Sequence, residues 1–171
     1  MGKKTWKLAL SSIFVALSVT VICIAGFIPT GQLGIVAFSS ILVAAAVIEI
    51  GMLESICIYG ASAILGMLLA ADKFSPLIYI FFFGYYPIIK TLIERINNLF
   101  YRCFLKLLSF NLALFIFMLL FENLLMMPQI KNTNKWIVHV LTSGIFALFD
   151  YGYSKLIWFY IERVSKSLRK G

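Results

Sequence analysis

The chain has few charged residues and none of the short motifs that mark common soluble enzymes. Only 13% of its 171 residues are charged, whereas a soluble domain carries about 25%. No G-x-x-x-x-G-K-[ST] loop occurs, so the chain does not hydrolyse ATP by itself through a P-loop. H-E-x-x-H and G-x-S-x-G are also absent. These absences leave a channel, a small membrane enzyme or one subunit of a larger assembly.

Cysteine is scarce as well. Cys23, Cys57 and Cys103 stand alone in three separate apolar stretches. Structural metal sites usually contain close pairs such as C-x2-C. The spacing therefore favours small buried hydrophobic residues. We expect no disulfide, no metal site and no cofactor.

What the chain has in abundance is apolar sequence. Hydrophobic residues make up 62% of it, with a mean hydropathy of +0.98. A helix that spans a bilayer needs roughly 20 mostly apolar residues. The sequence therefore predicts an all-α, polytopic membrane protein with six transmembrane helices in a single domain over residues 1–171. The predicted helices cover about residues 6–27, 35–50, 52–71, 77–93, 99–126 and 135–161.

Basic residues gather at every second break between these helices. With the N-terminus inside, 12 of the 15 Lys and Arg residues lie at cytoplasmic ends, as the positive-inside rule requires. Both termini are therefore predicted in the cytoplasm, and the protein in the cell membrane. We expect no nucleic-acid partner, because these basic residues anchor helices at the interface and form no folded basic surface.

Small residues line one face of the first predicted helix. Ala9, Ser12 and Ala16 follow the i, i+3, i+7 pattern of a single face. Helices in lipid associate through small residues and polar contacts rather than through the hydrophobic effect. Packing inside the protein would explain this face. Docking of another protein's helices is the alternative, and it suits a terminal helix whose small face lies near the cytoplasm.

The last three predicted helices each carry a line of polar and aromatic residues with the same offsets. The three lines are Tyr79, Phe83, Tyr86 and Lys90; Asn111, Phe115, Met118 and Glu122; and His139, Ser143, Phe146 and Asp150. Ionisable residues at membrane depth are costly and face the protein interior or a wet cavity. The repeated lines therefore predict an internal polar surface.

Depth divides these polar residues into two groups. Lys90 and Asp150 both lie roughly 20 Å from the outer surface at a rise of 1.5 Å per residue, so they are predicted to form an intramembrane ion pair, with a role in substrate coupling as the alternative. Glu94, at i+4 from Lys90, is a local alternative partner. Glu122 and His139 fall near the outer ends of adjacent helices. There they could orient a polar ligand, bind a cation or cap the helix bundle.

Pro87 interrupts the fourth predicted helix within FFFGYYPIIK. Proline inside a helix frees a backbone carbonyl and kinks the chain. We therefore expect a bend surrounded by aromatic rings, which could shape a pocket wall or be purely structural.

Together these features resemble the S components of energy-coupling-factor transporters. The opening KKTWKLALSSIFVALSVTV looks like the first helix of that family, whose A-x-x-x-A face meets a transmembrane coupling subunit. Ser12 and Ala16 stand at the matching positions, with Ala9 one turn earlier. Serine replaces one alanine of the family pattern. The IPTGQLG break resembles the loop that helps to close the binding site in the family.

The resemblance implies a substrate-capturing subunit without enzyme activity. Its partners would be the coupling subunit and two cytoplasmic ATPases, and its substrate a vitamin or other small organic ligand bound from outside. The N-terminal histidine of the family's cobalt and nickel members is missing here, so metal import is not expected. The substrate-binding candidates are Glu122, His139, Asn111, Tyr79, Tyr86 and Ser143. Two other functions stay open: a small polytopic enzyme or flippase for lipid-linked substrates, and a non-transporting accessory subunit.

Overall fold

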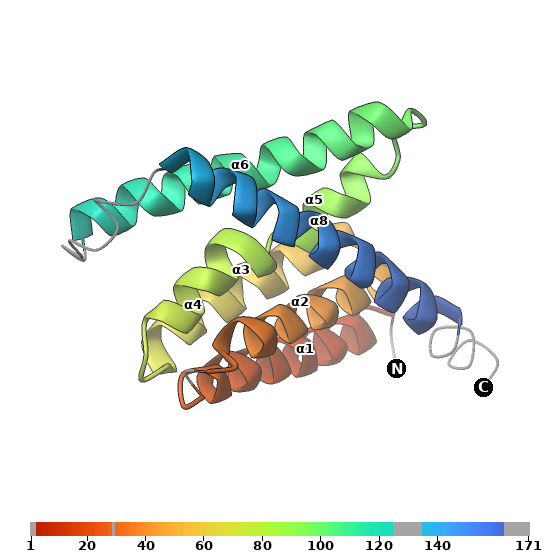
Figure 1. Cartoon of the computed structure of the whole chain (residues 1–171). Helices are drawn as coiled ribbons and strands as arrows, with labels where there is room; N and C mark the ends of the chain where they lie inside the picture. The colour runs from red at the N-terminus through yellow and green to blue at the C-terminus, as the bar shows by residue number, and fades with distance from the viewer. Residues whose placement is uncertain (1–2, 29, 125–134, 163–171) are drawn as a thin grey trace. The chain divides into compact units, whose positions relative to one another are not determined.

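The described part of the chain is helical and contains no strand. The computed structural model describes residues 3–28, 30–124 and 135–162; within the helices, the side chains of residues 3, 121–124 and 135–139 lie outside the described set. The helices, shown in Figure 1, are α1 (Lys3–Ala25), α2 (Gln32–Glu49), α3 (Met52–Leu69), α4 (Phe74–Ile78), the π-helix η1 (Tyr79–Phe83), α5 (Tyr86–Ile93), α6 (Leu99–Leu124) and α8 (Lys135–Tyr160).

Five of the described helical segments are long and apolar enough to cross a membrane. They are 4–25, 32–49, 52–69, 74–93 and 99–120. Their lengths and compositions indicate a multi-pass membrane protein, as predicted. The sixth predicted span corresponds to α8, which is 26 residues long but is not among these five. The sixth span and the cytoplasmic position of both termini stay predictions.

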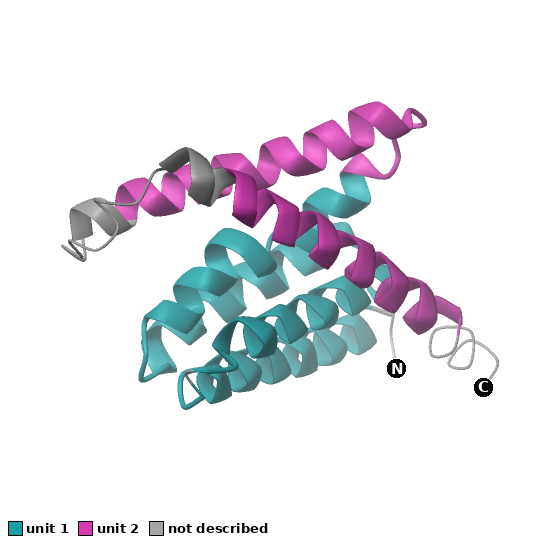
Figure 2. Cartoon of the chain, in the orientation of Figure 1, with its two compact units in different colours: residues 1–92, 165–171 teal, residues 93–164 magenta. Residues whose placement is uncertain are grey.

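The chain divides into two compact units (Figure 2). The N-terminal unit contains the described residues up to Leu92, and the C-terminal unit begins at Ile93. In the C-terminal unit, α6 and α8 pack against each other. They run in opposite directions, because Lys106 contacts Asp150 whereas Asn111 contacts Ser143.

Three neighbouring helices, α1, α2 and α3, form the body of the N-terminal unit. α1 and α3 run in the same direction, since Lys7 contacts Glu54 near their starts and Ile22 faces Gly66 near their ends. A Cβ built on Gly66 would lie 3.4 Å from Cγ2 of Ile22. The absence of a side chain at this position therefore lets the two helices approach closely, as is usual between helices in lipid.

The interior of this unit combines aliphatic side chains with small polar ones. Ile22, Val36, Val43 and Ile78 belong to its buried cluster. Six serines are fully buried on the same helices and on α4: Ser18, Ser39, Ser40, Ser55, Ser62 and Ser75. Large apolar residues point outward instead, as Leu53 and Leu68 do at 78% and 71% exposure. A surface this apolar suits contact with lipid and would be unusual for a soluble monomer.

A two-residue connection joins α2 to α3. Gly51 has φ of 127°, a backbone conformation that L side chains rarely adopt. The Ser55 hydroxyl donates a hydrogen bond of 2.7 Å to the carbonyl of Gly51 and so stabilises the first turn of α3. The predicted boundary between the second and third helices at Gly51 is therefore correct.

The fourth predicted span falls within the apolar segment 74–93, which is not one regular helix. The structure places α4, a π-helical turn and α5 in its range, with a bend at Gly84 and Tyr85. The amide of Gly84 donates to the carbonyl of Tyr79, which is the i→i+5 bond of a π-helix. Pro87 lies in the first turn of α5, where proline is tolerated. The bend predicted in FFFGYYPIIK is confirmed, and it begins before the proline.

Candidate functional site

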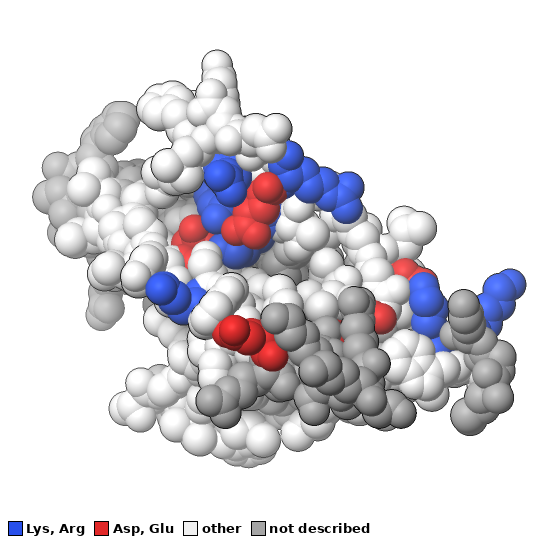
Figure 3. Space-filling model, turned by 90° about the vertical axis from the view of Figure 1, so that its right-hand side faces the viewer, with Lys and Arg blue, Asp and Glu red and all other residues white. Residues whose placement is uncertain are grey.

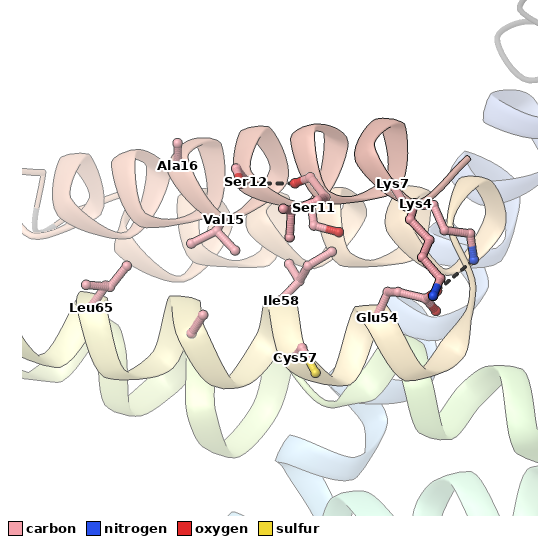
Figure 4. Close-up of a pocket in the computed structure, with 12 residues that line it drawn as sticks. Lys4, Lys7, Ser11, Ser12, Val15, Ala16, Glu54, Cys57, Ile58 and Leu65 are labelled. Carbon is pink, nitrogen blue, oxygen red and sulfur yellow. Dashed lines mark hydrogen bonds and ion pairs between the residues drawn. The ribbon is translucent and has the colours of Figure 1, made fainter. Parts of the chain in front are cut away.

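An open groove of about 690 Å³ runs between α1 and α3. All of its lining residues come from these two helices, which belong to the same unit. Figure 4 shows Lys4, Lys7 and Glu54 toward one end of the groove and Leu65 toward the other. The wall between these ends is built largely from apolar or small residues, among them Val15, Ala16, Cys57, Ile58 and Ala61.

The predicted docking face of α1 opens on this groove. Ala9, Ser12 and Ala16 are all exposed, and Ser12 and Ala16 line the groove. The hydroxyl of Ser12 donates a hydrogen bond of 3.0 Å to the carbonyl of Leu8 within its own helix. A partner that packs here therefore need not satisfy that hydroxyl. The face is not used for packing within the N-terminal unit, which leaves it accessible to a ligand or partner.

An ion pair closes one end of the groove. Nζ of Lys7 lies 2.6 Å from Oε1 of Glu54. The two side chains are 42% and 35% exposed. A pair this exposed contributes little to stability, because water screens it. The pair places one charge from α1 and one from α3 at the same end of a groove whose other lining residues are mostly apolar.

Two predicted substrate-binding residues contact each other between α6 and α8. The amide of Asn111 donates a hydrogen bond of 3.1 Å to the Ser143 hydroxyl and another of 2.9 Å to the carbonyl of Leu107. Next to this contact the rings of Phe110 and Phe146 stack with centroids 4.1 Å apart. The prediction that Phe115 shares an internal polar and aromatic face with Asn111 is therefore wrong, because Phe115 is 54% exposed. Phe110, and not Phe115, joins Phe146.

A charged cluster in the C-terminal unit was missed by sequence reasoning. Nζ of Lys106 lies 3.0 Å from Asp150 and 3.1 Å from Glu94. The Lys106 side chain is only 12% exposed. The sequence pattern places this lysine only among the basic residues predicted at cytoplasmic helix ends. A signal was present, because a charge seven residues into an apolar helix needs a partner.

Tyr79 and Tyr86, the other two described substrate-binding candidates, lie inside the N-terminal unit. They are 0% and 1% exposed. The Tyr79 ring lies 5.8 Å from the ring of Tyr59, and the Lys90 ammonium lies 5.7 Å above the Tyr86 ring. Lys90 itself is 2% exposed, so its charge is held near an aromatic face that favours cations.

Three of the predicted sites stay predictions. Glu122 and His139 lie on α6 and α8, but their side chains are outside the described residues. The predicted pair of Lys90 and Asp150 would join the two units. Asp150 does form a described ion pair within its own unit, with Lys106.

A hydrogen-bonded network ties the two loops at one end of the N-terminal unit. The side chain of Gln32, at the start of α2, donates to the carboxylate of Asp72 and to the Ser75 hydroxyl. Asp72 also accepts from the amides of Phe74 and Ser75. Partial burial raises the pKa of Asp72, but these donors outweigh it, so the pKa lies below its usual range. The carboxylate is thus held in its charged form.

The cysteines are less buried than the sequence predicted. All three are free, with Cys57 and Cys103 exposed and Cys23 half-buried. The prediction of small buried residues is therefore wrong for two of them, because they lie on outward faces of α3 and α6. Among the described residues, no three His, Cys, Asp or Glu side chains come together as metal ligands would.

Comparison with known proteins gave no relative: no family model, no curated protein and no solved structure matches the chain.

Proposed function

We propose that the protein is the substrate-capturing membrane subunit of an ATP-driven importer of the energy-coupling-factor type. The single observation that carries this proposal is the exposed small-residue face of α1, formed by Ala9, Ser12 and Ala16. In S components, which the chain resembles, this face meets the coupling subunit. The resemblance further implies substrate capture from outside, followed by tilting of the subunit against its partner and ATP hydrolysis in two separate subunits.

The docking role rests on steric grounds. Small side chains allow the backbones of two helices to come close, which is how helices associate in lipid. The Ser12 hydroxyl already donates a hydrogen bond to the carbonyl of Leu8. A partner therefore needs to match only the shape of this face and need not supply a hydrogen-bond acceptor. The adjoining groove along α3 adds a hollow that a bulkier side chain of the partner could fill.

The substrate role rests on polar groups that are held inside the membrane helices. Asn111 and Ser143 present an amide and a hydroxyl between α6 and α8. Both groups can donate and accept hydrogen bonds, so they suit an uncharged polar ligand. The stacked Phe110 and Phe146 next to them would suit its flat apolar part. Glu122 and His139 lie further toward the outer ends of the same helices by the predicted orientation.

Co-expression tests the docking face. The full-length protein should co-purify with a coupling subunit and its two ATPases. Ser12→Leu and Ala16→Leu should each weaken this complex about 5- to 150-fold, because overpacking costs about 1–3 kcal/mol. Ala147→Leu, the same exchange at an exposed position of α8, is the matched control. A complex that forms equally well in all three variants would contradict the docking role.

Uptake tests the substrate site separately. Once a ligand has been identified by mass spectrometry of the purified protein, Glu122→Gln, His139→Ala and Asn111→Ala should lower its uptake while the folded protein and the complex persist. Glu162→Gln, on an exposed residue at the opposite end of the same helix pair, should leave uptake unchanged. Normal uptake in all of the site variants would exclude this location for the substrate.

A further inference from the structure

The groove between α1 and α3 has the length of one membrane leaflet. Its α1 wall runs from Lys4 to Ala16, and its α3 wall from Glu54 to Leu65. At a rise of 1.5 Å per residue these walls are about 18 Å and about 16 Å long. The hydrocarbon core of a bilayer is about 30 Å thick, so one leaflet accounts for about 15 Å. The groove therefore extends from one interface to about the midplane.

Charge is confined to one end of this groove. Lys4, Lys7 and Glu54 lie there, and the rest of the wall is built of uncharged side chains (Figure 4). The three charges sum to one net positive charge. Lys4 and Lys7 have long stems that can lie along apolar surface while their ammonium groups stay at the interface. Because the apolar segment 4–25 begins at Lys4, we expect these ammonium groups at the level of the lipid phosphates.

We propose that this groove binds an anionic phospholipid. One acyl chain lies along the apolar wall between α1 and α3, and the phosphate and its anionic headgroup meet Lys4 and Lys7. The volume of about 690 Å³ falls within the range of about 300–1,000 Å³ that is usual for small-molecule sites. An anionic phospholipid matches this distribution of charge, because it has one charged end at the interface and an apolar chain of about one leaflet in length.

The lipid site does not depend on the proposed transport function. It needs only that α1 and α3 lie in a bilayer. Ser12 and Ala16 nevertheless belong both to the groove and to the docking face, so a docked coupling subunit and a bound acyl chain would compete for this wall. The lipid would then cover the small-residue face in the isolated subunit and leave when the complex forms.

Photocrosslinking of the isolated full-length protein tests the proposal. The protein is placed in phosphatidylcholine nanodiscs that contain a small fraction of lipid with a photoreactive acyl chain, either phosphatidylglycerol or phosphatidylcholine. Mass spectrometry then locates the labelled residues. Labelling should concentrate on the groove, for example at Val15 and Ala61, and phosphatidylglycerol should label it about fivefold more than phosphatidylcholine, the effect of one basic residue near an anionic headgroup.

Variants that remove a charge or fill the groove test the two parts of the lipid site separately. Lys4→Gln leaves the pair of Lys7 and Glu54 intact and should reduce labelling by phosphatidylglycerol about fivefold. Lys155→Gln, which removes an exposed lysine outside the groove, should not change it. Ala61→Leu should displace the acyl chain and reduce labelling by both lipids.

Three results would overturn the lipid site. The first is equal labelling of the groove by the two lipids with no effect of Lys4→Gln. The second is labelling spread evenly over the exposed faces of all helices. The third is crosslinked peptides that join two protein chains through the groove, which would identify a second copy as its occupant. No coupling subunit or substrate is present, so these results are independent of the docking and uptake tests.

Discussion

Lys106 lies between two carboxylates that differ in exposure, and the two ion pairs should therefore differ in strength. Asp150, 3.0 Å away, has a side chain that is 21% exposed, whereas Glu94, 3.1 Å away, is 43% exposed. Asp150→Asn and Glu94→Gln each remove one charge while they keep the shape of the side chain. The shortest distances to Nζ are nearly equal, and the two pairs differ in exposure and in a second contact, of 3.4 Å, from Nζ to the other carboxylate oxygen of Asp150.

The expected magnitudes follow from this difference. Exposed ion pairs contribute about 0–1 kcal/mol, whereas removal of one partner from a buried pair costs about 3–5 kcal/mol. The partly buried pair with Asp150 lies between these cases, so Asp150→Asn should cost about 2 kcal/mol of unfolding free energy. Glu94→Gln should cost less than about 1 kcal/mol, because water screens that pair.

A double-mutant cycle with Lys106→Met measures the coupling of each pair. Unfolding in mixed micelles gives the free energies of the single and double variants. The coupling between Lys106 and Asp150 should exceed the coupling between Lys106 and Glu94 by about 1 kcal/mol, above the scatter of about 0.3–0.5 kcal/mol for independent sites. Equal couplings, or a larger one for Glu94, would refute the argument that burial decides the strength of these pairs.

Two further predictions concern the N-terminal unit. Gly84→Ala should lower the unfolding temperature markedly, because its Cβ would lie 2.6 Å from two ring carbons of Tyr59 and 2.9 Å from one of Tyr79. Gly60→Ala, with nothing within 4 Å of its Cβ, is the control. Combination of Gly84→Ala with Tyr59→Leu should restore only part of the lost stability, because the contact with Tyr79 remains. Asp72 has a lowered pKa, so its stabilising effect is complete above the unfolded pKa of about 3.9 and is lost as pH falls through the folded pKa. The unfolding temperature of the wild type should therefore fall more steeply below about pH 4 than that of Asp72→Asn, and parallel curves would show that the loop network does not depend on the charge.

The sequence predicted the features that depend on local composition. Long apolar runs, the break after the first helix and the junction at Gly51 all appear where hydropathy and turn residues placed them. These features need only the neighbouring residues for their explanation, since an apolar run of sufficient length forms a helix in lipid. Pro87 also correctly marked a bend, although proline alone did not reveal the π-helical turn before it.

Contacts between distant residues could not be predicted in the same way. Gln32 and Asp72 are 40 positions apart, and neither stands out in the sequence. Phe110 contacts Phe146 although Phe115 matched the predicted offsets, because the rotation of α6 about its axis is set by its packing against α8. Helical periodicity places residues on a common face, but it does not determine which face meets the neighbouring helix.

The connection at Ile50 and Gly51 also bears on how the protein is made. Only two residues separate α2 from α3. The connection therefore has no polar loop that could remain at the membrane surface while α2 inserts before α3. Such a short connection makes them a helical hairpin. During synthesis the two segments are therefore expected to enter the bilayer together, and an insertion that lengthens this connection would let each helix be inserted or rejected on its own hydrophobicity.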